Sequence, residues 1–331
     1  METGRNIPEK LNLRMDASVL GRLRQMKIGV LMGGLSEERQ ISLKTGDAIL
    51  KALLSRGYNA QAVDFDRDIN GRLASEKIEF AYIALHGKYG EDGVVQGLLE
   101  LAGIPYTGSG ILASALAMDK LMSKRLFEYN GLKTAPFLVY DRGCGIGPGD
   151  IEERIGFPLV VKPRFQGSAI GVSIVKKADL LKSALSEGLK FGDSLIIEKY
   201  ITGKEVTLGM IGSGVVLPMI EIIPKGGEFY DFNSKYTPGM SAHIIPPSLP
   251  EDALTRAYGA GVMAYKALSC SGVSRVDMII TAEGEPYVLE VNTIPGMTET
   301  SLVPDAAKAA GIDFVALVEY IMYDSFLKEG R

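Results

Sequence analysis

Residues 27–64 read KIGVLMGGLSEERQISLKTGDAILKALLSRGYNAQAVD and indicate the fold class of the chain. An apolar strand over Lys27–Met32 ends at two glycines. Apolar residues at helical spacing then predict a helix over Ser36–Arg56. Further strands are predicted at Ala60–Asp64 and Phe80–Leu85. This alternation of strand, helix and strand predicts a doubly wound α/β unit with a parallel sheet.

The pattern changes after this unit to an α+β arrangement. A long helix is predicted over Leu112–Asn130, and later strands alternate with loops in a way that favours antiparallel sheets. A hairpin is predicted over Val273–Ile294. We therefore expect four segments. They are a loose N-terminal extension (1–26), an N-terminal α/β substrate domain (27–115), a central domain (116–205) and a C-terminal catalytic and metal-binding domain (206–331).

Composition excludes several classes of protein. The chain has 331 residues, and 36 basic against 40 acidic side chains give a net charge of −4. This balance argues against a nucleic-acid partner. The two cysteines, Cys144 and Cys270, fit a reducing compartment. No apolar run is long enough to cross a membrane, and the N-terminus lacks the apolar core of a signal peptide. We expect a cytoplasmic protein.

The C-terminal hairpin carries a set of hard oxygen ligands. Because side chains alternate faces along a strand, Arg275 and Asp277 share one face, and Glu290 and Asn292 share one face of the returning strand. Leu289 should point the other way. Paired in register, these faces suit Mg²⁺ bound together with substrate phosphates. The alternative is an ordinary solvent-facing surface, but the turn that follows Asn292 exposes backbone N–H groups and favours the metal site.

Two central segments suit a nucleotide. Lys162 ends an apolar strand and enters the loop PRFQGSAIG, residues 163–171, in which glycines and Ser168 can approach phosphate oxygens. A plain hairpin turn is the alternative, although the loop is longer than a hairpin usually needs. Glu198 and Glu205 flank the end of another strand and suit adenine and ribose contacts, or they are simply exposed.

Three other segments end or begin where ligands bind in α/β folds. Glu38 opens the first helix and could capture a substrate amine, or it could serve helix capping. His86 ends a strand before a glycine-rich loop, although a lone histidine is more often structural. With only two histidines, a multi-histidine metal site is excluded. The polar loop Tyr230–His243 is long enough to close over a site.

Several motifs, in order, resemble those of the D-alanine–D-alanine ligases of the ATP-grasp superfamily, from about Met26 to Tyr323. The most specific are LHGKYGEDG (85–93), YTGSG (106–110), MDK (118–120), YDFNSKY (230–236) and EVNTIPGMT (290–298). The resemblance implies an ATP-grasp fold, in which a parallel α/β domain precedes two α+β domains that clamp ATP. It also implies a homodimer.

The resemblance implies a role for each matching position. ATP would contact Lys120, Lys162, Ser168, Glu198, Lys199, Tyr200, Ile201 and Glu205. Two Mg²⁺ ions, or Mn²⁺, would bind Asp277, Glu290 and Asn292. The first D-alanine would contact Glu38 and His86, and the second Lys235 and Ser301. Glu38, Ser168 and Tyr236 would form a hydrogen-bonded triad, and Arg275 with the backbone of Gly296 would form the oxyanion site.

The implied reaction joins two D-alanine molecules through a D-alanyl phosphate, for peptidoglycan precursor synthesis. Tyr236 favours D-alanine as the second substrate, because a histidine at the matching position accompanies D-lactate in this family. Two residues depart from the family pattern: Ala169 stands where many members carry a second serine, and Arg164 is bulky for this loop. One hydroxyl contact to phosphate is therefore not expected, and backbone N–H groups could replace it. The alternatives are a D-alanine–D-lactate or D-alanine–D-serine ligase, a non-catalytic ATP-binding regulatory protein, and, least favoured, a dinucleotide oxidoreductase, whose GxGxxG motif is missing.

Overall fold

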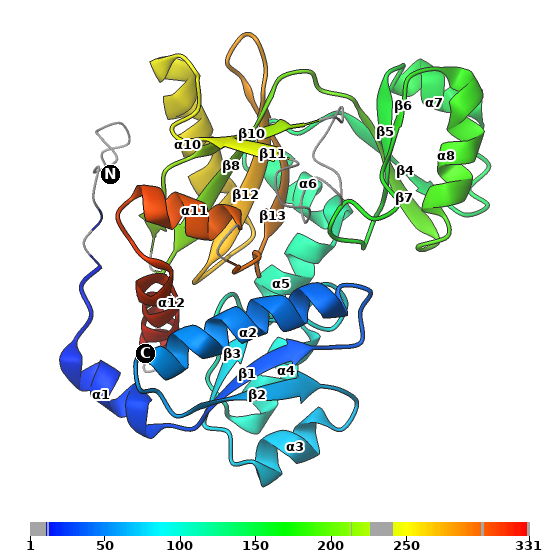
Figure 1. Ribbon diagram of the computed structural model, residues 1–331. Helices are drawn as coiled ribbons and strands as arrows, with labels where there is room; N and C mark the ends of the chain where they lie inside the picture. The colour runs from blue at the N-terminus through cyan, green and yellow to red at the C-terminus, as the bar shows by residue number, and fades with distance from the viewer. Residues whose placement is uncertain (1–10, 12, 213, 226–240, 299–300, 330–331) are drawn as a thin grey trace.

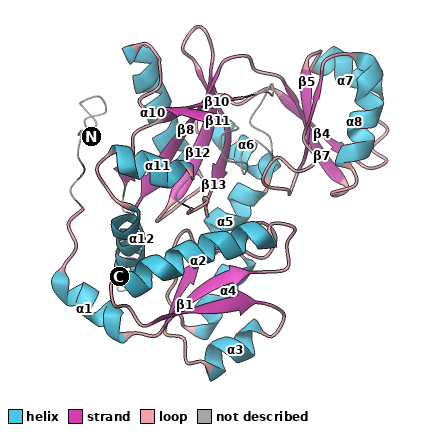
Figure 2. Cartoon of the chain, in the orientation of Figure 1, coloured by secondary structure: helices cyan, strands magenta, loops and turns pink. Residues whose placement is uncertain are grey.

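Three sheets form the framework of the molecule, which is described by a computed structural model over residues 11, 13–212, 214–225, 241–298 and 301–329 (Figures 1 and 2). The first sheet is parallel, and the two that follow it along the chain are antiparallel. The predicted change from a parallel α/β unit to antiparallel units is therefore confirmed. No helix in the described part of the chain is long and apolar enough to span a membrane.

The parallel sheet has the strand order β2-β1-β3. Its strands are β1 (Ile28–Gly33), β2 (Ala60–Phe65) and β3 (Phe80–Ile83). Alternate residues of β1 supply two cores: Ile28 and Val30 pack with the residues of helix α2, whereas Leu31 packs with those of α3 and α4. These helices are α2 (Arg39–Ser55), α3 (Ile69–Ser75) and α4 (Val94–Ala102). The sheet is therefore covered on both faces, as a parallel sheet requires.

The middle sheet is antiparallel, with the order β4-β7-β5-β6. Its strands are β4 (Phe137–Asp141), β5 (Leu159–Pro163), β6 (Ser173–Val175) and β7 (Ser194–Lys199). Helices α7 (Pro148–Arg154) and α8 (Leu181–Gly188), with the short 3₁₀ helix η1 (Ala178–Leu180), complete this unit. Apolar residues of α7 and α8 pack with one face of the sheet. The opposite face contributes to the cavity described below.

The largest sheet has the order β11-β10-β8-β12-β13, and β9 pairs with β8. Its strands are β8 (Lys204–Ile211), β9 (Val215–Val216), β10 (Ile220–Pro224), β11 (Ser241–Ile244), β12 (Ser274–Ile280) and β13 (Pro286–Asn292). Helix α10 (Glu251–Ala267) and residues of α6 (Lys120–Tyr129) pack with one face. Helices α11 (Leu302–Ala309) and α12 (Phe314–Glu329) end the chain.

The long helix predicted over Leu112–Asn130 is two helices, α5 (Ile111–Met118) and α6 (Lys120–Tyr129). Asp119 interrupts it with an extended backbone, φ −84° and ψ 98°, and its side chain accepts hydrogen bonds from the N–H groups of Leu121 and Met122. An aspartate in this position starts a helix. Apolar spacing along this segment also predicts that Tyr129 lies on the buried face of the helix, but Tyr129 is exposed whereas Lys124 is buried.

The N-terminal extension differs from the loose segment expected. Within it, Ala17–Gln25 forms helix α1, capped by Asp16, whose side chain accepts hydrogen bonds from Ser18 and Val19. Leu23 is fully buried in the same core as α12. Apolar residues at helical spacing thus give α1 a face to bury.

Candidate active site

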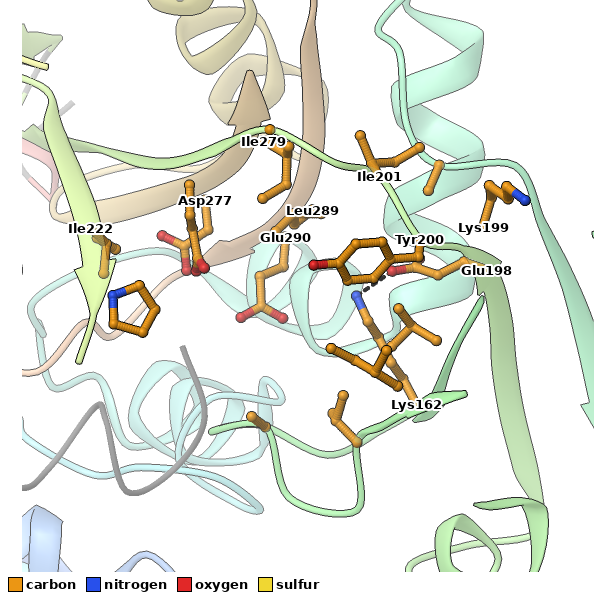
Figure 3. A pocket seen from close by; sticks show the side chains of 18 of the residues that line it. Lys162, Glu198, Lys199, Tyr200, Ile201, Ile222, Asp277, Ile279, Leu289 and Glu290 are labelled. Carbon is orange, nitrogen blue, oxygen red and sulfur yellow. Dashed lines mark ion pairs between the residues drawn. The ribbon is translucent and has the colours of Figure 1, made fainter. Parts of the chain in front are cut away.

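A cavity of about 440 Å³ lies between the middle sheet and the largest sheet (Figure 3). Strands β5 and β6 and the end of β7 supply one wall, and β8, β10, β12 and β13 supply the other. Among the residues predicted to bind ATP, all but Ser168 line it: Lys120, Lys162, Glu198, Lys199, Tyr200, Ile201 and Glu205. Asp277 and Glu290 also line it. The cavity has the size and mixed lining of a nucleotide site.

Glu198 lies at the base of this cavity between two ammonium groups. Its carboxylate is 2.8 Å from Lys124 Nζ and is also paired with Lys162, as Figure 3 shows for the second pair. Burial by itself would raise the pKa of Glu198, but the two lysines outweigh it and lower the pKa to about 2. The pKa of Lys162 is raised, since Glu198 overcomes the effect of burial. Glu198 and Lys162 are therefore both charged at neutral pH.

The opposite wall carries the two carboxylates of the predicted metal site. Asp277 lies directly across the β12–β13 pair from Glu290, and Arg275 lies across from Asn292, as the sequence predicted. Both carboxylates point toward the cavity (Figure 3). Asp277 accepts hydrogen bonds from Thr207 Oγ1 at 2.6 Å and from Arg275, at 2.9 Å from Nε and 2.8 Å from Nη2.

The strand pairing also corrects one expectation. Leu289 was expected to point away from Glu290, but both residues line the cavity. The register shifts here, because Asp277 pairs with Glu290 whereas Met278 pairs with Val288. This β-bulge leaves Leu289 as the extra residue and turns it toward the cavity. An apolar side chain thus lies beside the carboxylates on the nucleotide side.

The donor set fits a hard cation that is bound together with phosphates. Among the residues that the structure describes, no three or more His, Cys, Asp and Glu side chains gather into a metal-binding group. Asp277 and Glu290 supply two carboxylates, and Asn292 supplies an amide oxygen that accepts a hydrogen bond from the Ile294 N–H at 3.0 Å. Mg²⁺ prefers a site that has few protein carboxylates and leaves space for phosphate oxygens.

The glycine-rich loop joins this cavity to Glu38. At its start, Arg164 holds the carboxylate of Asp119 through two hydrogen bonds, of 2.7 and 2.5 Å. Gln166 and Ala169 line the cavity, whereas Ser168 donates a hydrogen bond to Glu38 Oε1. The loop can do both because Ser168 and Ala169 have left-handed backbones, with φ of 51° and 57°. Ser168 thus lies at Glu38, and not on the nucleotide cavity.

Glu38 contacts the same loop, and His86 precedes Gly87, which lies against Glu38; both residues are outside the lining of the nucleotide cavity. Both are buried, with 5% of each residue exposed. His86 Nε2 lies 3.1 Å from Thr45 Oγ1, and its Nδ1 lies 4.0 Å from a Glu91 carboxylate oxygen. The ring is therefore held from both sides. A buried carboxylate beside the loop of Ser168 is placed to receive a cationic group.

Gly296 and Ser301 lie together at the start of α11. A Cβ added at Gly296 would be 3.0 Å from Ser301 Oγ, so a larger residue would crowd this hydroxyl. Ser301 Oγ accepts a hydrogen bond from the Thr298 N–H at 3.1 Å. The helix start suits a carboxylate. Lys235 and Tyr236, the remaining predicted site residues, lie outside the described residues.

Several residues of the site were not predicted from the sequence. Lys204 and Glu221 line the cavity and pair with each other, with 2.9 Å between their charged atoms. Lys124 supports Glu198 from behind. The pairing of Arg164 with Asp119 was also missed, because these residues lie 45 positions apart in the sequence.

The chain is similar to known proteins over most of its length. The family model "D-ala D-ala ligase C-terminus" matches residues 126–323, and "D-ala D-ala ligase N-terminus" matches 66–109. The chain is 51% identical to a D-alanine–D-alanine ligase of Geotalea uraniireducens over 92% of this chain and 97% of that one. It is 52% identical to one of Geobacter sulfurreducens, over 92% and 96%. The crystal structure of the Bacillus anthracis ligase complexed with ATP superposes with a TM-score of 0.81, at 38% identity, over 92% of this chain and 99% of that one.

Proposed function

Because the chain belongs to the D-alanine–D-alanine ligase family of ATP-grasp enzymes, we propose how its residues carry out the ATP-dependent joining of two D-alanine molecules. That activity, which forms ADP and serves peptidoglycan synthesis, is the function of the chain. The observation that carries the residue assignments is the cavity that has Lys162 and Glu198 on one wall and Asp277 and Glu290 on the other.

ATP occupies this cavity in the proposal. The adenine lies against the end of β7, where the backbone of Tyr200 and Ile201 borders it beside Lys199 and Glu198, all four of which line the cavity. Glu205 binds the ribose hydroxyls. Lys120 and Lys162 carry the positive charge that phosphates need, since both line the cavity. Ser168 completes the loop over the phosphates from its position at Glu38.

Asp277, Glu290 and Asn292 would hold two Mg²⁺ ions, for which Mn²⁺ can substitute. Their oxygens are the hard ligands that these cations take, and the carboxylates face the cavity. When bound, the ions supply neutralisation of the charge on the transferring phosphoryl group. Arg275 holds Asp277 through two hydrogen bonds and so keeps that carboxylate oriented.

The residues near Glu38 bind the first D-alanine and support its activation. Glu38, with His86 beside it, takes the amino group of the first D-alanine, and this orients its carboxylate toward ATP. A carboxylate oxygen attacks the γ-phosphorus, the bond to the bridging oxygen breaks, and ADP leaves with a D-alanyl phosphate behind it. The closed glycine-rich loop limits access of water to this acyl phosphate.

The second D-alanine binds near the start of α11. Ser301 and Lys235 hold its carboxylate, and its deprotonated amine attacks the acyl carbon. Arg275 and the N–H of Gly296 stabilise the oxyanion before phosphate leaves and the peptide bond is complete. Tyr236, linked to Ser168 and Glu38, helps to select D-alanine over D-lactate or D-serine at this position.

The assignment is tested by measuring phosphate release and product together. We expect phosphate release from ATP that requires D-alanine and Mg²⁺ and yields D-alanyl-D-alanine in a one-to-one ratio. With D-alanine and D-lactate both present at neutral pH, the dipeptide should dominate. Dominant depsipeptide would overturn the assignment of the second substrate. An absence of D-alanine-dependent phosphate release would favour a non-catalytic ATP-binding protein.

Three broader properties complete the proposal. The chain divides into segments 27–115, 116–205 and 206–331, one for each sheet. It works as a homodimer, to which the apolar side chains exposed on α4 and α5 can contribute: Val94, Leu101, Ile111 and Leu112. Gel filtration with light scattering tests the dimer, since a monomeric mass at micromolar concentration would contradict the dimer.

The protein acts in the cytoplasm, where ATP is available.

A further inference from the structure

One buried cation in the described part of the chain has no role in the scheme above. Lys124 lies on α6 with 2% of its surface exposed, and it lies behind the residues that line the cavity. A lysine is almost never fully buried unless it is paired, because the ammonium group loses its hydration. The partners of Lys124 therefore show what its charge serves.

Three groups from different elements surround this ammonium. Lys124 Nζ lies 2.8 Å from Glu198 Oε2 and donates a hydrogen bond to Thr134 Oγ1 at 2.6 Å. It also lies 5.0 Å from the centre of the Phe137 ring, within the range of a cation–π contact. Thr134 in turn donates to the Val288 carbonyl on β13 at 3.0 Å. The ammonium is thus fixed in position between the middle sheet and the largest sheet.

Glu198 divides its carboxylate between two lysines. Glu198 Oε2 is paired with Lys124, which does not line the cavity, and Oε1 is paired with Lys162, which does. One negative and two positive charges leave this cluster with a net charge of +1. Without Lys124, Glu198 and Lys162 would form a neutral pair, and the cavity floor would offer a polyanion much less attraction.

We propose that Lys124 is a positioning residue for nucleotide binding, whose buried charge offsets that of Glu198 so that Lys162 presents a net positive charge to the phosphates. This inference rests on the proposed nucleotide role of the cavity. Lys124 touches neither the cavity nor the nucleotide in this scheme, and it acts through Glu198. A purely structural lysine would instead anchor α6 and leave nucleotide affinity unchanged.

The two roles separate in the variant Lys124→Met, which keeps the length of the side chain and removes the charge. ADP binding is measured by titration calorimetry, together with steady-state kinetics of the full chain. We expect the dissociation constant for ADP and the KM for ATP to rise about 10- to 100-fold, the usual effect of losing a charge-assisted interaction. The KM for D-alanine should stay within about twofold. An unchanged ADP affinity would overturn the inference.

The double variant Lys124→Met/Glu198→Gln tests the charge argument directly. It removes one charge of each sign and leaves the net charge of +1 on Lys162. The probe for this variant is inorganic triphosphate, which makes no adenine contact with Glu198, and the double variant should bind it more tightly than Lys124→Met. Equal or weaker binding in the double variant would contradict the electrostatic role. Lys133→Met serves as the matched control, because Lys133 is exposed and pairs with Glu285 away from the cavity, and it should bind ADP normally.

A third variant covers the case in which Lys124→Met fails to fold. Thr134→Val keeps the shape of the side chain and removes the hydroxyl that holds Lys124, so we expect about a threefold weaker ADP affinity. Wild-type affinity would overturn the inference. The proposed function is judged separately by the wild-type chain. If wild type shows no ADP binding, the nucleotide site fails, whereas normal wild-type binding with unaffected variants rejects the role of Lys124 alone.

Discussion

Replacing Arg164 with alanine tests how the glycine-rich loop is anchored. Arg164 joins the start of this loop to Asp119, the residue that caps α6, through two hydrogen bonds with 22% and 14% of the two side chains exposed. Burial by itself would raise the pKa of Asp119, but Arg164 and the backbone N–H of Met122 lower it, so the pair is ionised at neutral pH. The bond between loop and helix is therefore an ion pair that is largely removed from water.

The size of the effect follows from this geometry. A partly buried, two-bond arginine–carboxylate pair contributes about 1–2 kcal/mol, more than an exposed pair. If the closed loop loses that stabilisation and ATP binds the closed form, the KM for ATP rises about 5- to 30-fold. We expect kcat at saturating ATP to change much less, because Arg164 touches no reacting atom in the proposed scheme.

The assay is phosphate release at saturating D-alanine over a range of ATP concentrations. Arg142→Ala is the matched control, since Arg142 pairs with Asp193 in the same unit but with 57% and 83% of the side chains exposed. Its KM for ATP should match that of wild type. If Arg164→Ala gave a wild-type KM, or the same change as Arg142→Ala, the loop would not depend on this ion pair.

Three further changes have defined outcomes. Glu290→Gln should lower kcat by about 100-fold or more with an unchanged Tm. The control Glu283→Gln, in the turn of the same hairpin, should stay active. A near-normal kcat in Glu290→Gln would show that Glu290 is not part of the metal site. Leu23→Ala should lower the free energy of unfolding in urea by about 2–5 kcal/mol, because this side chain is fully buried, against little change for the exposed Leu54→Ala; equal losses would mean that α1 is not part of the core. Burial raises the pKa of Cys270 to about 11, so its thiol stays protonated at pH 8 and should react slowly with a disulfide reagent. Exposed Cys144 should react quickly with the same reagent and so produce the fast phase of the reaction. If the fast phase were still present in Cys144→Ser, this prediction would be contradicted.

The fold class could be predicted from the sequence because the signals are local. The strand before Gly33, the helix that follows and the paired faces of Asp277 and Glu290 all depend on spacing within one or two elements. The break between α5 and α6 at Asp119 was missed because apolar periodicity continues through it. Aspartate is nevertheless a common N-cap residue of helices. Strict alternation likewise failed at Leu289, where one inserted residue reverses the face.

The supports of the site were hidden for a different reason. A lysine on a helix, such as Lys124, is usually expected at the surface. Its buried partner Glu198 becomes apparent only in the folded protein, where α6 lies next to the end of β7. Arg164 looked too large for the phosphate loop until the fold placed Asp119 beside it. Residues that touch ligands belong to recognisable sequence motifs. The residues that hold those side chains in place depend on long-range contacts in the fold, and patterns in a single sequence do not show such contacts.

The shared core of the two chain ends has a consequence for synthesis on the ribosome. Helix α12 lies beside α2 (Figure 1), and Tyr58, just after α2, donates a hydrogen bond to Glu319, 261 residues later, at 2.6 Å. At roughly 5–20 residues per second, the apolar face of the first sheet waits about 10–50 s for its cover. The nascent first unit is therefore a natural client for chaperones that shield exposed apolar surface, and truncation within α12 should expose the same face permanently.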